Sequence, residues 1–308
     1  MIKVEGLTKT YGARMALDHV SFEVPKGEIF GFVGPNGAGK TTTIRILAAL
    51  LEPTEGRALI DGADVTLERD AVHERLGYMP DFFGVYDQLT VSEYLHFYAA
   101  CYRQPRERRT KVVNDLLELV ALSERRDQAV DTLSRGLKQR LCLARALVHD
   151  PAVLLLDEPA SGLDPRARVE MREILKTLQG LGKTIVISSH ILPELTELCT
   201  MVGIIDHGQM RATGPVDEVI QRLTSGRRLR ITVLGQREEA VAVLKALPAV
   251  RHVDATGDAL EAQYEGDEAA AASILHSLMG AGVKVSGFSE LDGGLEDAFL
   301  KATSEDVG

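Results

Sequence analysis

The chain has no tryptophan and three cysteines in 308 residues. Cys101, Cys142 and Cys199 are odd in number and form no Cys-x-x-Cys pair, which argues against a disulfide framework and against a zinc site. No apolar run approaches the roughly 18 residues that a membrane-spanning helix needs. The first residues also lack the basic stretch and long apolar core of a secretion signal, so we expect a cytoplasmic protein.

The overall charge is acidic, because 45 Asp and Glu residues outnumber 35 Lys and Arg residues, for a net charge of -10. A general nucleic-acid binder needs a basic face that displaces counterions from phosphates, so this balance disfavours that class. With 45% apolar and 26% charged residues, the composition is that of a folded globular protein. A chain of this length is expected to form at least two domains.

Three patterns follow one another along the first 225 residues. Two alternating apolar runs in the first thirty residues predict antiparallel strands, and a strand, a glycine-rich loop and a helix come next. Helical periodicity from about Thr90 to Ser123 predicts a helical insert, placed at about 84–135. Short apolar runs then alternate with helical stretches, which is typical of a layered α/β sheet with crossover helices.

The pattern changes near Gly226. From there to residue 308, strand-like and helical runs mix, which predicts a small C-terminal α+β domain after a first domain at 1–225. This second domain holds 14 acidic and 8 basic residues, so its net charge is 8 − 14 = -6. The expected fold is therefore a mixed α/β sheet with an antiparallel edge and a helical insert, followed by a small α+β domain.

The strongest chemical motif is GPNGAGKTT, which matches G-x-x-x-x-G-K-[ST] between a predicted strand and a predicted helix. Its glycines let backbone N–H groups close around phosphate oxygens, Lys40 can reach the outer phosphates, and the Thr41 hydroxyl can coordinate Mg²⁺. A chance glycine-rich turn is the weaker alternative, because the flanking strand and helix are in place. The predicted nucleotide-binding residues of this loop are Gly34, Asn36, Gly37, Ala38, Gly39, Lys40, Thr41 and Thr42.

The run VLLLDEP, from Val153 to Pro159, delivers two carboxylates at the end of a hydrophobic strand, where ligands of parallel sheets collect. Asp157 suits a place in a Mg²⁺ shell, and Glu158 can orient or deprotonate the water that attacks a γ-phosphate. Taken alone, an acidic strand end exposed to solvent is the favoured interpretation. Because a phosphate-binding loop lies upstream, the site interpretation of Asp157 and Glu158 is favoured instead.

Ser134 and Gly136 stand at the start of a predicted helix in LSRGLKQRLCLARAL. Taken alone, this serine favours simple N-capping over an anion site. The ordered set of the phosphate-binding loop, LSRGL, LLLDEP, SGLD and a strand ending in His190 nevertheless resembles the nucleotide-binding subunit of ATP-binding cassette (ABC) transporters. The resemblance covers about residues 1–225.

The resemblance implies roles for further residues. Tyr11 matches the aromatic residue that stacks on adenine, with a strand-edge tyrosine as the alternative. LSRGL stands in the place of the signature LSGGQ, so Ser134 and Gly136 would contact the γ-phosphate of ATP held by a second copy. Asp164 matches the loop that communicates between the two sites, and His190 matches the histidine that contacts the γ-phosphate.

The chain departs from the family's pattern in two places. Arg135 and Leu137 differ from the signature. Asp81 stands where the family has a glutamine that helps to ligate Mg²⁺ and senses the membrane partner. An aspartate can still bind the ion through oxygen, but it adds a negative charge near the phosphates. The predicted metal ligands are thus Thr41, Asp157 and Asp81.

The resemblance implies an ATPase with ATP and Mg²⁺ as cofactors and Glu158, His190 and Lys40 as catalytic residues. The protein would act as a head-to-tail homodimer on the inner face of the cell membrane. There it would drive a separate integral membrane permease. The helical insert and the loop from Asp81 to Leu89 would meet that permease. The C-terminal part is similar to the tail of drug-exporter-type subunits, which implies export.

Other interpretations stay open. A low-turnover, ATP-dependent clamp or regulatory protein is one alternative, and Asp81 is the feature that favours it. A soluble ABC ATPase acting on ribosomes or DNA is another, which the single cassette, the modest insert and the acidic charge disfavour. The basic run Arg103–Lys111 favours a solvated helix break over a contact with anionic lipid headgroups.

Overall fold

The computed structural model describes residues 1–81, 84, 88–189, 192–223, 227–256, 259–291, 299 and 302–303. The chain divides into two compact units, Met1–Val216 and Asp217–Gly308. The boundary precedes residue 225, where the sequence pattern changes, because the helix at Val216–Leu223 falls almost entirely within the second unit.

A central sheet organises the first unit. Its strands within the described ranges are β3 (Ile29–Val33), β6 (Leu76–Met79), β7 (Val153–Asp157), β8 (Thr184–Ser189), β9 (Met201–Asp206) and β10 (Gln209–Pro215). They lie in the order β10-β9-β3-β8-β7-β6, and all pair in parallel except β10, which is antiparallel to β9. Every residue of β3 and β7 is buried, which explains the continuous apolar runs of these strands.

A second sheet of the first unit is antiparallel. It comprises β1 (Ile2–Tyr11), β2 (Arg14–Val24), β4 (Glu55–Ile60) and β5 (Ala63–Asp64), in the order β2-β1-β4-β5. The antiparallel strands expected near the N-terminus are confirmed, but they are longer than the apolar runs that indicated them. Only Gly12 and Ala13 separate β1 from β2, because Gly12 takes a φ of 59° that permits a tight turn.

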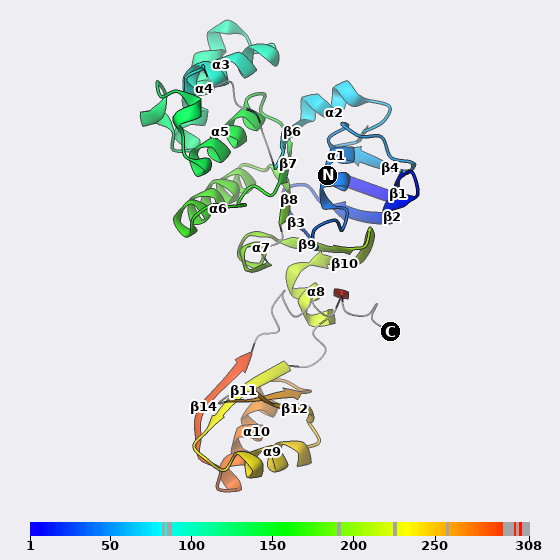
Figure 1. Cartoon of the computed structure of the whole chain (residues 1–308), viewed down its shortest axis with the longest axis vertical. Coiled ribbons are helices and arrows are strands. Elements are labelled where there is room, and N and C mark those ends of the chain that lie inside the picture. Colours follow the sequence, from blue (N-terminus) through cyan, green and yellow to red (C-terminus); the bar gives the residue numbers. More distant parts are fainter. Residues whose placement is uncertain are drawn as a thin grey trace. The chain divides into compact units, whose positions relative to one another are not determined.

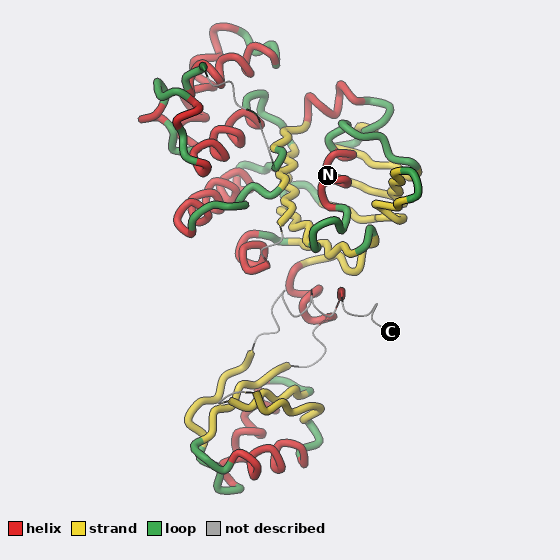
Figure 2. Tube along the Cα trace, viewed as in Figure 1, coloured by secondary structure: helices red, strands yellow, loops and turns green. Residues whose placement is uncertain are grey.

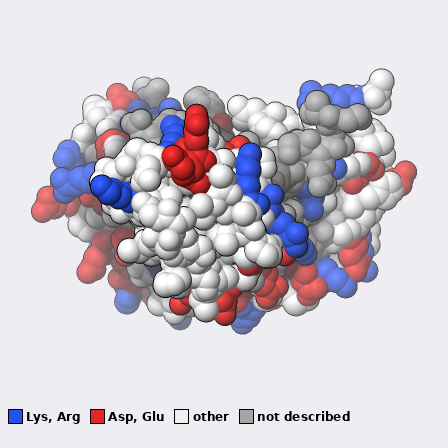
Figure 3. Space-filling view, turned by 90° about the horizontal axis from the view of Figure 1, so that it is seen from below, with Lys and Arg blue, Asp and Glu red and all other residues white. Residues whose placement is uncertain are grey.

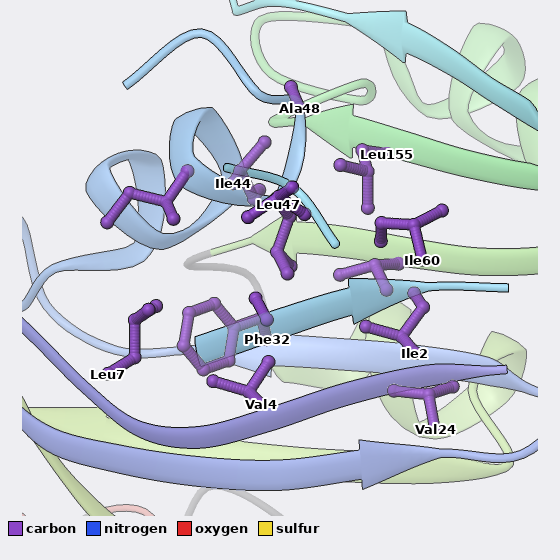
Figure 4. Close-up of a cluster of buried hydrophobic side chains, with 14 of the residues drawn as sticks. Ile2, Val4, Leu7, Val24, Phe32, Ile44, Leu47, Ala48, Ile60 and Leu155 are labelled. Carbon is purple, nitrogen blue, oxygen red and sulfur yellow. The ribbon is translucent and has the colours of Figure 1, made fainter. Parts of the chain in front are cut away.

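The hydrophobic core of the first unit includes side chains from both sheets and from helix α1 (Lys40–Leu47), as Figure 4 shows. Ile44 and Leu47 of α1 belong to one buried cluster with Phe32 of the central sheet and Ile60 of the antiparallel sheet. This packing holds the start of α1 at the end of β3. The glycine-rich loop between them is thereby anchored at both of its ends.

Further helices of the first unit are α2 (Arg69–Arg75), α3 (Val91–Cys101), α4 (Arg106–Leu119), α5 (Arg135–Leu147), α6 (Pro165–Gly180) and α7 (Leu192–Leu198), with 3-10 turns at Ser123–Arg125 and Val130–Thr132. Helices α5, α6 and α7 cover the face of the central sheet opposite to α1 (Figure 1). Helices α3 and α4 fall within the expected helical insert and contact α5. Helix α4 begins inside the basic run, so the break between the two helices is short.

The second unit contains most of α8 (Val216–Leu223), followed by β11 (Arg227–Val233), α9 (Arg237–Ala246), β12 (Val250–Thr256), β13 (Ala259–Tyr264), α10 (Glu268–Gly280) and β14 (Val285–Leu291). The four strands form an antiparallel sheet in the order β12-β13-β11-β14. Helices α9 and α10 lie on one face of it (Figure 2). This β-α-β-β-α-β succession is a ferredoxin-like arrangement, which confirms the expected α+β class.

The surface carries charges of both signs. On the face shown in Figure 3, acidic and basic side chains are interspersed around larger uncharged areas. Elsewhere in the described part of the chain, some charged side chains form ion pairs, such as Lys111 with Asp115 at 2.6 Å and Arg166 with Glu170 at 3.1 Å. Exposed pairs of this kind contribute little to stability, so the fold depends on its buried clusters. Within the described ranges, no helix is long and apolar enough to cross a membrane.

Candidate functional site

A pocket of about 420 Å³ is lined by residues that follow β3, β6 and β7 and by residues at the adjoining ends of β1 and β2. Ligands of parallel α/β sheets bind outside the carboxyl ends of the strands, and this pocket has that location. Most of the predicted site residues meet here. Those that line it are Tyr11, Asn36, Gly37, Gly39, Lys40, Thr41, Thr42, Asp81 and Glu158.

The start of α1 is shaped to receive an anion. Gly39 is the N-cap with a φ of 113°, and a Cβ atom there would lie 2.6 Å from Leu17 Cδ2, so only glycine fits. The first turn of α1 contains no acidic residue. The unpaired N–H groups and the helix dipole at this end therefore favour phosphate oxygens.

Two predicted phosphate-contacting residues lie behind the loop and do not line the pocket. A Cβ atom on Gly34 would lie 2.3 Å from the carbonyl oxygen of Ile205, and Ala38 is buried with its N–H donating to the Pro35 carbonyl at 3.2 Å. Both residues therefore fix the shape of the loop against the central sheet. Their side-chain positions offer no contact surface to a nucleotide.

Lys40 joins the glycine-rich loop to the acidic end of β7. Its ammonium group donates hydrogen bonds to the carbonyl oxygens of Gly34 at 2.6 Å and Pro35 at 3.2 Å, and it lies 4.0 Å from Oε1 of Glu158. Burial lowers the pKa of Lys40, while the charges of Glu158 and Asp157 act in the opposite direction. Phosphate oxygens beside this ammonium group would favour its charged form further.

The oxygen atoms of the site suit a hard divalent cation. Thr41 Oγ1 donates to Oδ1 of Asp157 at 3.3 Å, Asp157 is almost fully buried, and Asp81 lines the same pocket. Among the described residues, no three His, Cys, Asp or Glu side chains gather into a metal cluster. A hydroxyl and one or two carboxylates match Mg²⁺, which proteins typically bind together with substrate phosphates.

Glu158 follows β7 in an uncommon backbone conformation. Its φ of 52° lies in the left-handed region, and its carbonyl accepts a hydrogen bond from Ser161 N at 3.1 Å. This turn directs the carboxylate toward Lys40, whereas Asp157, one residue earlier, points toward Thr41. The two neighbouring carboxylates therefore serve different parts of the pocket.

The other predicted nucleotide contacts line a second pocket of about 450 Å³ at the starts of α5 and α6. Ser134 caps α5 by accepting from Leu137 N at 3.4 Å, and Asp164 caps α6 by accepting from Ala167 N at 2.8 Å. Ser134 therefore caps its helix, and its predicted contact with a nucleotide stays a prediction. Gly136 lies beside them, and the chain does not bring these three residues into the first pocket.

Arg135 adds a positive charge to the second pocket, which Arg140, Arg166, Asp164 and Glu170 also line. It is exposed at the first position of α5, and its guanidinium group covers Gly162, where a Cβ atom would lie 2.5 Å from Nη1. Within the part of the chain that the structure describes, the Arg135 side chain has no hydrogen bond or ion pair. This cation therefore adds to the positive end of the α5 dipole.

Arg14 and Ser161 also line the first pocket and were missed by the sequence reasoning. Nη2 of Arg14 lies 3.6 Å from the position of a Cβ atom on Gly37, so its guanidinium group sits beside the loop. Its side chain makes no hydrogen bond or ion pair to any described residue. The sequence signal that could have indicated Arg14 is the two-residue turn between β1 and β2. This turn pairs Arg14 with Tyr11, which was itself a predicted site residue.

His190 lies outside the described residues, as does most of the loop between Asp81 and Gln88. Strand β8 ends at Ser189, immediately before this histidine. The predicted role of His190 therefore stays a prediction. Tyr11 is about half exposed, with 49% of its surface accessible, which leaves an aromatic surface for a stacked base.

Comparison with known proteins gives one family. Residues 17–161 match the family described as ABC transporter. The chain is 34% identical to the linearmycin resistance ATP-binding protein LnrL of Bacillus subtilis, over 91% of this chain and 89% of that protein. It is 35% identical to the daunorubicin/doxorubicin resistance ATP-binding protein DrrA of Streptomyces peucetius, over 98% of this chain and 92% of that protein.

Solved structures agree with these relatives. An ATP-binding subunit of an ABC transporter superposes with a TM-score of 0.66 at 30% identity, covering 72% of this chain and 92% of the other. A dimeric ATP-binding cassette in a post-hydrolysis state, bound to ADP and Pi, gives a TM-score of 0.64 at 28% identity, covering 70% and 98%. The expected cassette fold thus has solved counterparts, one of which is bound to ADP and Pi.

Proposed function

Because this chain belongs to the ABC transporter family and is an ATP-binding cassette ATPase, we propose that two copies of it hydrolyse Mg·ATP to drive a separate membrane permease. The convergence of Lys40, Thr41 and Glu158 on one pocket at the start of α1 carries this proposal. A cation, a hydroxyl and a carboxylate at a helix N-terminus are the groups that phosphoryl transfer to water requires.

Each group has a distinct task in hydrolysis. Lys40 and the N–H groups of the loop stabilise negative charge on the outer phosphates. Glu158 orients the attacking water and accepts its proton. Thr41, Asp157 and Asp81 would hold Mg²⁺, which supplies charge neutralisation at the phosphates when it is bound. Tyr11 would stack on adenine.

The second pocket supports a head-to-tail dimer. Ser134 and Gly136 at the start of α5 line a different pocket from Lys40 in the same chain, so a contact between them and one nucleotide needs a second copy. The dipole of α5 and the Arg135 guanidinium group would face the γ-phosphate held by the partner. A related solved cassette is a dimer, which favours this assembly.

The proposals of a permease partner and of export as the direction of transport are based on the names of the related proteins. Two of them are named for resistance to linearmycin and to daunorubicin and doxorubicin, and others for Nod factor export. We therefore assign this chain to the inner face of the cell membrane, bound to an integral membrane permease that exports its cargo. The helical insert of α3 and α4 is the surface for that partner.

Phosphate release by the purified protein tests the proposal. The wild type is expected to hydrolyse ATP, faster when membranes holding the permease are added, and Lys40→Ala is expected to lose ATP binding and hydrolysis. The acidic Asp81 in the pocket favours one alternative, a low-turnover clamp. ATP-driven dimerisation with negligible phosphate release, with or without the permease, would select the clamp and reject the transport ATPase.

A further inference from the structure

A buried serine on β8 connects the two carboxylate residues at the end of β7. Ser188 pairs with Asp157 in the parallel register of these strands and is fully buried. Its hydroxyl donates to Oδ1 of Asp157 at 2.6 Å and accepts the N–H of Glu158 at 2.9 Å. The Ser188 hydroxyl thus acts as a donor to one residue of the site and as an acceptor from the next residue.

The bond to Glu158 holds a backbone conformation that needs support. The φ of 52° is one that residues with a Cβ atom adopt only at an energetic cost. This turn is held by hydrogen bonds that include Ser161 N to the Glu158 carbonyl at 3.1 Å and Glu158 N to Ser188 Oγ at 2.9 Å. Because the turn directs the carboxylate, Ser188 influences where Glu158 lies relative to Lys40.

The bond to Asp157 orients the other carboxylate. Oδ1 of Asp157 accepts from Ser188 Oγ at 2.6 Å and from Thr41 Oγ1 at 3.3 Å. A short bond to an ionised carboxylate is stronger than one between neutral groups, so Ser188 limits rotation of the Asp157 side chain. A continuous series of hydrogen bonds then runs from Thr41 at the start of α1 to the backbone of Glu158.

We propose that Ser188 is a positioning residue for ATP hydrolysis, which fixes the Asp157 carboxylate and the Glu158 turn in one arrangement. The proposal rests on the ATPase function and adds to it a residue that does not line the nucleotide pocket. Loss of the hydroxyl should therefore slow the hydrolytic step and weaken metal binding. Binding of ATP without metal, which depends on the loop and Lys40, should change little.

Ser188→Ala tests this proposal against a matched control, Thr184→Val. Thr184 lies at the other end of β8, is buried, and accepts the N–H of Gly27 through its hydroxyl at 3.0 Å. Both variants remove a buried, hydrogen-bonded hydroxyl, so both should lower the thermal unfolding midpoint. We expect kcat to fall about tenfold or more in Ser188→Ala and less than about twofold in Thr184→Val.

Two binding measurements separate positioning from general damage. Mn²⁺ affinity, measured with a non-hydrolysable ATP analogue, should fall several-fold in Ser188→Ala, whereas metal-free ATP affinity should stay within about twofold of the wild type. Equal losses of kcat in Ser188→Ala and Thr184→Val would overturn the proposal. So would a loss of metal-free ATP binding that matches the loss of kcat.

A second variant protects the test from misfolding. Ser188→Cys keeps a side chain of similar shape but replaces the hydroxyl by a weak donor and acceptor, so it should also lower kcat and Mn²⁺ affinity. If Ser188→Cys had the kcat and the Mn²⁺ affinity of the wild type, Ser188 would have no positioning role. The Mn²⁺ measurement does not require hydrolysis, so it tests Ser188 even if the wild type releases no phosphate, a result that would contradict the proposed function alone.

Discussion

The ammonium nitrogen of Lys40 lies 4.0 Å from Oε1 of Glu158, although the two residues belong to motifs far apart in the chain. They meet because β3 and β7 both pair with β8 in the central sheet, so the carboxyl ends of the two strands lie near each other. A cation that can bind phosphates thus lies beside a carboxylate that can activate water. Hydrolysis needs both groups at one phosphate.

Replacing Glu158 by glutamine should separate binding from hydrolysis. Gln keeps the size of the side chain but cannot accept a proton, so kcat should fall about 100-fold or more. ATP binding should be retained, and the ATP-bound dimer should become more stable because hydrolysis no longer ends it. Phosphate release and size-exclusion chromatography with ATP measure the two effects.

The control is Glu173→Gln, an exposed glutamate on α6 away from both pockets. It should leave hydrolysis unchanged. A Glu158→Gln protein with the wild-type rate of phosphate release would remove Glu158 from the role of base.

ATP affinity should depend on pH through Lys40. Burial lowers the pKa of this ammonium group from its usual value of 10.5, and bound phosphates favour the charged form. Affinity should thus be highest at pH values below the pKa of Lys40 in the free protein and fall as the pH rises through it. The fall should begin at a lower pH than for an exposed lysine.

Metal-free ATP titrations between about pH 7 and about pH 10 measure this dependence. Lys40→Arg is the control, because arginine keeps its charge throughout this range. The fall of ATP affinity with rising pH should be absent in Lys40→Arg. Identical pH profiles for the wild type and Lys40→Arg would assign the dependence to another group.

Sequence reasoning located the parts of the site that the chain order specifies locally. The glycine-rich loop stands between its own strand and helix, and the acidic pair ends its own strand, so no knowledge of pairing was required. The cap positions of Ser134 and Asp164 follow from the same local rules. The fold class followed from the alternation of strands and helices.

Residues that depend on strand pairing could not be found in this way. Ser188 acquires its role only because β8 lies beside β7 in a particular register, which the order of residues along the chain does not specify. Arg14 enters the pocket because β1 and β2 continue to a two-residue turn, where polar alternation hid the strands. Tertiary contacts thus decide roles that the linear pattern does not contain.

Asp81→Gln tests the acidic residue in the place of the family's glutamine. The change removes a negative charge from a pocket that would hold a triphosphate, so metal-free ATP should bind more tightly, by about fivefold for an interaction near 1 kcal/mol. If Asp81 also ligates Mg²⁺, the Mg²⁺ concentration that supports half-maximal hydrolysis should rise. Nucleotide titrations in EDTA and Mg²⁺ titrations of phosphate release measure the two effects.

Asp127→Asn makes the same change of charge on the exposed surface of the insert region and should alter neither quantity. Asp81→Gln could bind metal-free ATP more tightly and still need the same Mg²⁺ concentration for half-maximal hydrolysis. That result would show that Asp81 acts only through its negative charge and is not a metal ligand. An unchanged ATP affinity would contradict its place beside the phosphates.

Arg14→Gln should weaken ATP binding without changing the chemistry of hydrolysis. The guanidinium group of Arg14 lies beside Gly37 at the mouth of the loop and can form charge-assisted hydrogen bonds to phosphate oxygens, worth about 1.5–3 kcal/mol in proteins. The Kd for metal-free ATP should therefore rise about tenfold or more, while the Kd for adenosine, which has no phosphates, should stay the same. Arg251→Gln is the control, because Arg251 pairs with Glu265 at 2.7 Å in the second unit. Equal losses for ATP and adenosine would place Arg14 against the base or the ribose, and no loss for either would exclude it from the nucleotide site.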